Sequence, residues 1–159
     1  MIQKTIALVA HDNRKKDLIA WVERNWERLI QHRLYCTGTT GSLVEQAILG
    51  KIAEGKEEQK YSENDLLLTK LKSGPFGGDQ QLGALIAEGK IDMMIFLWDP
   101  MQPQPHDVDV KALNRISVLY NVPLANNRAT ADFMISSPLF ATDYKPELKD
   151  YSSYLNRKV

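Results

Sequence analysis

The chain has 159 residues, of which 43% are hydrophobic and 25% are charged, a balance typical of one globular domain with a core of its own. Its 20 Lys and Arg residues equal its 20 Asp and Glu residues, so the formal net charge is zero. This balance argues against nucleic acid or an anionic membrane surface as a partner, and any anion must be bound by a local group of residues.

The first elements along the chain are a strand and a helix. Residues Thr5–Ala10 (TIALVA) form a continuous apolar run, as expected for a strand buried on both faces of a parallel sheet. Apolar residues then recur at helical spacing from Leu18 to Ile30, which predicts an amphipathic helix. His32, near the end of this helix, is expected to be structural or solvated.

The remaining elements continue the same alternation. Strands are expected near residues 33–36, 66–71, 93–98 and 122–125, and helices from Ser42, over Asp79–Glu88, over Val110–Tyr120, over Ala129–Ser136 and in part of the tail from Asp143. The charged stretch Gly50–Asn64 has no clear period and predicts a solvated excursion or a helix extension. The order predicts an α/β fold, namely a three-layer α/β/α domain with an open, mainly parallel five-stranded sheet that is doubly wound.

The apolar stretches and the cysteine content of the sequence indicate its cellular compartment. The apolar run after residue 5 is too short for the hydrophobic region of a signal peptide, and no stretch approaches the length of a membrane span. The only cysteine, Cys36, allows no disulfide within the chain. We therefore expect a cytoplasmic protein.

Polar residues follow each predicted strand. Because the carboxyl ends of parallel strands meet at one edge of the sheet, where such folds bind ligands, these residues are expected to converge. The segments in question are His11-Asp12, Thr37–Gly41, Ser73–Asp79, Asp99–Asp109 and Asn126-Asn127.

Two of these segments have the composition of a phosphate-binding loop. Thr37–Gly41 (TGTTG) combines two glycines with three hydroxyl groups ahead of a predicted helix, and Ser73–Gly78 is also rich in glycine. Lys15, in the first turn of the first helix, is within reach of the same edge. The alternative reading is a pair of tight turns with helix-capping residues and a solvated lysine.

Three further residues suggest acid–base chemistry. Asp79 begins a helix beside a glycine-rich loop, so it is either a cap or a base that removes a proton next to a carbonyl group. His106 can transfer protons near neutral pH, and Asp109 can orient it, although a loop histidine and a capping aspartate would look the same. A metal site is a weaker alternative, since no HxxxH or paired-cysteine spacing supports one among Asp12, Asp79, His106, Asp107 and Asp109. The residues alone indicate a small phosphorylated ligand.

The sequence closely resembles the methylglyoxal synthases over nearly its whole length. The segments that carry the resemblance are IALVAHD (Ile6–Asp12), TGTTG (Thr37–Gly41), SGPFGGDQQLGALI (Ser73–Ile86), IFLWDP (Ile95–Pro100), PHDVDVKAL (Pro105–Leu113) and ATADF (Ala129–Phe133). The resemblance implies a lyase that converts dihydroxyacetone phosphate to methylglyoxal and inorganic phosphate through an enediolate, as a glycolytic bypass. It also implies no metal and no organic cofactor, assembly as a homohexamer, and inhibition by phosphate.

The resemblance further implies roles for individual residues. Asp79 would be the base, His106 would polarise the carbonyl group and shuttle protons, and Asp109 would support that charge network. His11, Asp12 and Asp99 match site positions of less defined role, and a C-terminal arginine that reaches a neighbouring subunit's site matches Arg157, with Lys158 as the competing choice. The substrate phosphate would be held by Lys15, Thr37, Gly38, Thr39, Thr40, Ser73 and Gly74.

The sequence departs from the family pattern at about residues 50–64, which look like a charged insertion between motifs of a single domain spanning residues 1–159. Two other readings stay open. The same fold serves as a regulatory ligand-binding module in larger enzymes, although Asp79, His106 and Asp109 are all present here. The second is a related phosphate-releasing enzyme that acts on another small substrate.

Overall fold

The computed structural model describes residues 2–55, 60–103 and 107–156. Five strands form one fully parallel sheet in the order β3-β2-β1-β4-β5, which confirms the predicted fold class. The strands are β1 (Thr5–Ala10), β2 (Arg33–Cys36), β3 (Leu67–Lys70), β4 (Met93–Leu97) and β5 (Leu124–Ala125). Because all five strands run in the same direction, their carboxyl ends share one edge of the sheet.

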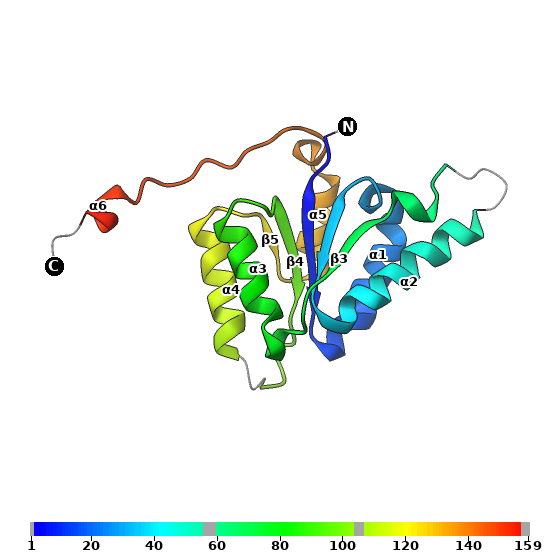
Figure 1. Cartoon of the computed structure of the whole chain (residues 1–159), viewed down its shortest axis with the longest axis horizontal. Helices are drawn as coiled ribbons and strands as arrows, with labels where there is room; N and C mark the ends of the chain where they lie inside the picture. The colour runs from blue at the N-terminus through cyan, green and yellow to red at the C-terminus, as the bar shows by residue number, and fades with distance from the viewer. Residues whose placement is uncertain (1, 56–59, 104–106, 157–159) are drawn as a thin grey trace.

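Helices cover both faces of this sheet (Figure 1). The main helices are α1 (Lys15–Leu29), α2 (Gly38–Glu54), α3 (Gly78–Ala87), α4 (Asp107–Leu119) and α5 (Arg128–Ser136). The first, second and fifth pack on one face, whereas α3 and α4 pack together on the other. The result is the three-layer α/β/α arrangement that the sequence predicts.

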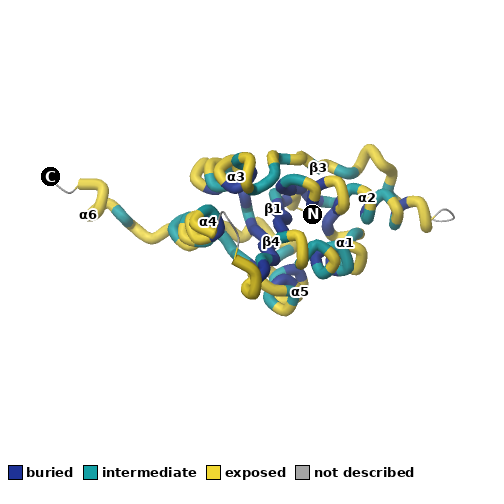
Figure 2. Tube along the Cα trace, turned by 90° about the horizontal axis from the view of Figure 1, so that it is seen from below, coloured by how far each residue is buried: buried dark blue, intermediate teal, exposed yellow. Residues whose placement is uncertain are grey.

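The position of β1 at the centre of the sheet explains why its sequence is apolar throughout. Ile6 and Leu8 belong to the core beneath α1, α2 and α5, whereas Ala7 and Val9 belong to the core beneath α3 and α4. Alternate side chains of a strand point to opposite faces, so a strand with helices on both sides has no polar face. Figure 2 looks along the strands and shows β1 and β4 buried between the helical layers, whereas the edge strand β3 is largely exposed.

Helix α2 begins earlier than predicted, and its carboxyl end agrees with the helix extension that was one of the two readings for the charged stretch. It begins at Gly38 after the extended residue Thr37, so most of the expected TGTTG loop is the first turn of the helix. Glycine suits the start of this helix because Gly38 has a φ of +50°, in the left-handed region that glycine adopts without a steric penalty. At its other end α2 continues to Glu54, so residues 50–54 extend the helix.

After α5 the chain leaves the α/β/α layers. A 3-10 turn at Pro138–Ala141 is followed by an extended segment that ends in the short helix α6 (Ser152–Leu155), away from the sheet (Figure 1). None of the helices within the described ranges is both long and apolar enough to cross a bilayer.

Candidate functional site

A cavity of about 410 Å³ opens at the carboxyl edge of the sheet. It lies where β1, the start of α2, and the segment before α3 meet, as the strand-end argument predicted. Its walls contain most of the residues proposed from the sequence: His11, Asp12, Lys15, Thr37, Gly38, Thr39, Thr40, Ser73, Gly74 and Asp79, together with Val9, Ala10, Pro75 and Phe96.

Lys15 provides the positive charge in this cavity. Its Nζ donates to Oδ1 of Asp12 at 2.6 Å and to Oγ1 of Thr39 at 2.5 Å. Its side chain is only 19% exposed, whereas that of Asp12 is 94% exposed. The hydrogen bond and the charge of Lys15 lower the pKa of Asp12, and Asp12 and Thr39 hold the ammonium group at the pocket wall, where it can bind an anion.

The two glycine-containing segments touch through their backbones. The amide of Gly38 donates to the carbonyl oxygen of Lys72 at 3.1 Å. A Cβ on Gly38 would lie 2.8 Å from the Cβ of Ser73, and one on Gly78 would lie 1.9 Å from the carbonyl oxygen of Lys72. Only glycine allows this approach, which brings the amino-terminal turns of α2 and α3 to one cavity, and amides at such turns attract anions.

Asp79 is the buried carboxylate of the site. It lies in the first turn of α3 and is only 6% exposed. It lines the main cavity and also a smaller one of about 120 Å³ between α3 and α4, whose wall includes Asp109. Asp109 therefore faces Asp79 from the α4 side and does not line the main cavity. His106 and Arg157 lie outside the described residues.

Asp99 lies behind the wall of the cavity. Its backbone amide donates to Nδ1 of His11 at 3.1 Å, and its Oδ2 accepts from Nδ2 of Asn13 at 2.9 Å. The hydrogen bond from Asn13, followed by one from the amide of Met101, lowers the pKa of Asp99. The ring of His11 packs edge-to-face against Phe96, with 5.5 Å between centroids.

Sequence reasoning did not single out Asn13 or Phe96. An asparagine in the polar turn between β1 and α1 resembles any solvated residue, and a phenylalanine within a buried strand resembles any core residue. The only usable signal was that both lie at the carboxyl ends of neighbouring strands.

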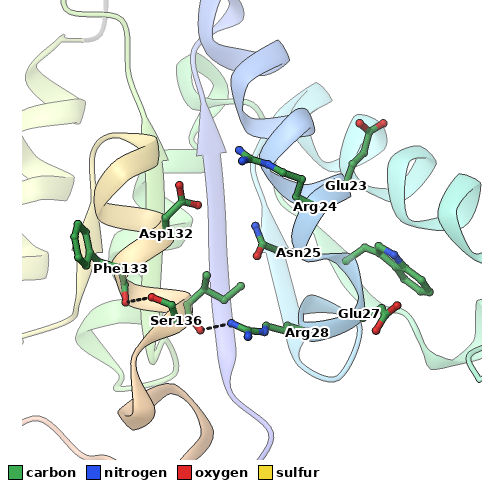
Figure 3. A pocket seen from close by; sticks show the side chains of 10 residues that line it. Glu23, Arg24, Asn25, Glu27, Arg28, Asp132, Phe133 and Ser136 are labelled. Atoms are coloured by element: carbon green, nitrogen blue, oxygen red, sulfur yellow. Dashed lines mark hydrogen bonds between the residues drawn. The ribbon is translucent and has the colours of Figure 1, made fainter.

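A larger cavity of about 640 Å³ lies elsewhere, between α1 and α5 (Figure 3). Acidic and basic side chains alternate on its α1 wall, and Nη1 of Arg28 donates to the carbonyl oxygen of Ile135 at 2.9 Å. Its described lining residues come from α1 and α5, and none of them lies in a loop at the carboxyl end of a strand, so this cavity lacks the features of the carboxyl-edge site. Among the residues that the structure describes, no three His, Cys, Asp or Glu side chains are grouped to hold a metal ion.

The fold and the cavity define an α/β protein suited to bind a small anionic ligand at the carboxyl edge of a parallel sheet. The family model described as the MGS-like domain matches residues 17–126. The chain is 56% identical over 156 residues to the methylglyoxal synthase of Maridesulfovibrio salexigens, with 98% of each chain covered. It is 51% identical over 154 residues to that of Leptospira interrogans, with 97% of this chain and 93% of the relative covered.

A solved structure agrees with these sequence matches. The crystal structure of methylglyoxal synthase from Elizabethkingia anophelis NUHP1 superposes with a TM-score of 0.83 at 48% identity, covering 99% of this chain and 93% of that one. The chain therefore belongs to the methylglyoxal synthase family.

Proposed function

We propose that the protein is a carbon–oxygen lyase that converts dihydroxyacetone phosphate to methylglyoxal and inorganic phosphate. The observation that carries the proposal is the convergence, in one cavity, of the ammonium group of Lys15, two glycine-containing helix starts and the buried carboxylate of Asp79. These are the groups that a phosphate elimination needs: a holder for the phosphate and a base for the carbon skeleton.

The phosphate end of the substrate would lie against Lys15 and the amino-terminal turns of α2 and α3. The hydroxyl groups of Thr37, Thr39, Thr40 and Ser73 and the amide of Gly74 would donate to its oxygens, while Gly38, whose amide is bonded to Lys72, would let the two segments approach each other beside the phosphate. Donors that are already in place stabilise the charge that grows on a departing phosphate, and they hold the scissile bond in one orientation.

Asp79 would remove a proton from the hydroxymethyl carbon of the substrate. The electron pair of that C–H bond forms the C=C bond of an enediolate, with the negative charge on the former carbonyl oxygen. The proton of the remaining hydroxyl group then moves to the central oxygen, and the oxygen that loses it forms the aldehyde C=O bond. The C=C electron pair shifts to the bond between the central carbon and the phosphate-bearing carbon, and the bond from that carbon to the phosphate oxygen breaks with its electron pair on phosphate, which takes up a proton as it leaves. The remaining enol takes up a proton on carbon to give methylglyoxal, so the chemistry needs no metal and no organic cofactor.

The roles of three further residues follow from the resemblance. His106 would polarise the carbonyl group and shuttle protons, Asp109 would support it, and Arg157 would reach the site of a neighbouring subunit in a homohexamer. Phosphate would inhibit by occupying the cavity from which it leaves as product. A cytoplasmic location is part of the same proposal and suits Cys36, a buried free thiol.

The test is to incubate the purified protein with dihydroxyacetone phosphate in the presence of EDTA and to follow methylglyoxal and phosphate together. Equal release of both products is expected. Tight binding of a phosphorylated ligand without turnover would instead indicate the regulatory module, and turnover of another small phosphate ester in a substrate panel would indicate a related enzyme.

A further inference from the structure

The ends of β1 and β4 are joined beyond the sheet by three hydrogen bonds. The amide of His11 donates to the carbonyl oxygen of Leu97 at 3.1 Å, which continues the strand ladder. The amide of Asp99 then donates to Nδ1 of His11 at 3.1 Å, and Nδ2 of Asn13 donates to Oδ2 of Asp99 at 2.9 Å. Asn13 is therefore connected to a pocket residue, His11, through a residue that lies behind the pocket wall.

The contact at Nδ1 determines where neutral His11 carries its proton. A nitrogen that accepts a hydrogen bond from a backbone amide has no hydrogen of its own, so the ring proton is on Nε2. The edge-to-face contact with Phe96 restrains the plane of the ring. His11 thus has one tautomer and one orientation, provided that the amide of Asp99 stays in place.

The position of that amide depends on the carboxylate of the same residue. Asp99 is only 8% exposed, and its two oxygens have different partners, the amide of Met101 at 2.9 Å on Oδ1 and the side chain of Asn13 on Oδ2. Losing the Asn13 partner would leave one oxygen of a largely buried carboxylate without this donor, and the carboxylate would turn toward water. Because Asn13 itself is exposed, its replacement removes this hydrogen bond with little loss of packing.

We propose that Asn13 is a positioning residue which, through Asp99, keeps His11 as a fixed Nε2–H donor for the reaction. The proposal rests on the proposed function, because the oxygen that would accept from His11 is one on which negative charge develops as the enediolate forms. Asn13 itself would not touch the substrate. Its effect would appear in the chemical step and not in the binding of phosphate, which depends on Lys15 and the helix starts.

The experiment compares two substitutions at Asn13 with a matched control. Asn13→Ala deletes the donor, and Asn13→Asp keeps the shape of the side chain but places a second carboxylate against Asp99. Asn25→Ala is the control, because Nδ2 of Asn25 also makes one hydrogen bond, to the carbonyl oxygen of Trp21 at 2.8 Å, within α1 and away from the site. For each protein, kcat and KM are measured with dihydroxyacetone phosphate, and Kd is measured with inorganic phosphate.

The tautomer is read separately by nitrogen NMR of protein labelled at its three histidines, with the His11 signals assigned from a His11→Gln variant. This readout needs no turnover, so it tests the positioning of His11 even if the protein fails to release methylglyoxal. In the parent protein, His11 should show only the Nε2–H tautomer.

The expected result for Asn13→Ala is a mixture of His11 tautomers and a kcat about ten- to a hundredfold lower, the size of effect that a small misplacement of a reacting group produces. Asn13→Asp should lower kcat further than Asn13→Ala does. In both variants the Kd for phosphate should stay within about twofold of the parent value. Asn25→Ala should match the parent protein in kcat, KM and Kd. A pure Nε2–H tautomer in Asn13→Ala would overturn the proposal, whatever happens to the rate. An unchanged kcat alongside a mixed tautomer would overturn it equally, as would an Asn13→Asp protein as active as the parent.

Discussion

Gly38 and Ser73 are in such close contact that a Cβ on Gly38 would lie 2.8 Å from the Cβ of Ser73. Gly38 also has a φ of +50°, in the left-handed region that favours glycine. The close approach therefore depends on glycine in two independent ways. It joins the segment after β2 to the segment after β3, and so it sets the distance between the two helix starts that line the cavity.

Gly38→Ala should weaken phosphate binding about tenfold or more. A left-handed alanine costs about 1–2 kcal/mol, and the new methyl group would push the Ser73 segment away from the cavity. The measurement is calorimetry with inorganic phosphate, alongside the KM for dihydroxyacetone phosphate. Gly50→Ala is the control, since a Cβ there meets nothing within 4 Å, and it should leave binding unchanged while stabilising α2 slightly. A folded Gly38→Ala protein with the parent affinity would contradict this account.

Lys15→Met should raise the KM for dihydroxyacetone phosphate about 10- to 100-fold, as expected for the loss of a charge-assisted hydrogen bond worth about 1.5–3 kcal/mol. If phosphate inhibits from the same cavity, its inhibition constant should rise by a similar factor. Lys16→Met removes the same charge from the neighbouring exposed position and should change neither constant. A rise in KM without a matching rise in the inhibition constant would place the inhibitory phosphate elsewhere.

Asp79→Asn should fold normally and lose turnover, because the amide has the shape of the carboxylate but cannot accept the proton. The kcat should fall by a factor of at least about 10² to 10⁴, while the Kd for phosphate stays within a few-fold of the parent value. Glu88→Gln neutralises an exposed carboxylate at the other end of α3 and serves as the control. Near-parent turnover in folded Asp79→Asn would remove Asp79 from the role of base.

The sheet could be predicted because the sequences of its central strands reflect their burial on both faces. The continuous apolar runs of β1 and β4 predict helices on both faces of the sheet, and the polar residues after each strand indicate which edge binds the ligand. The predicted start of α2 at Ser42 was wrong, because a glycine-rich stretch looks the same in sequence whether it is a loop or the first turn of a helix. The insertion at about residues 50–64 stays a prediction; of this stretch, the structure describes the continuation of α2 to Glu54 and a 3-10 turn that begins at Glu63.

The site was predictable to the extent that its residues follow strands directly. His11 and Thr37 were found in this way, and Asp79 was found at the start of the helix that follows β3, because strand order brings all three to one place. The link from Asn13 through Asp99 to His11 was not predictable, because it depends on side-chain directions that spacing does not encode. The same limit applies to Asp109, whose position on α4 facing Asp79, beside the smaller cavity, comes only from how α3 and α4 pack.

His32 is fully buried at the opposite end of the sheet, and this predicts a pH dependence of stability. Its Nδ1 accepts from the backbone amide of Lys4 at 3.1 Å, and its ring packs against Phe140 with 5.0 Å between centroids. Burial, and then the charge of Lys4, lower the pKa of His32, although Asp92 acts in the opposite direction. The unfolded chain therefore takes up a proton at His32 more readily than the folded chain does.

The direction of the pH dependence of stability follows from this difference in the pKa of His32 between the folded and unfolded chains. The contribution of His32 to the free energy of unfolding is fully present above the unfolded pKa of about 6.5, and it is lost as the pH falls toward the lower pKa of the folded state. Urea unfolding between about pH 7.5 and 5.5 should thus show stability decreasing with acid. His32→Asn keeps an acceptor for Lys4 but cannot be protonated in this range, so its stability should change less over the same interval. Equal pH slopes for the two proteins would show that acid acts through other groups, because His32 is the only titrating group that the substitution removes.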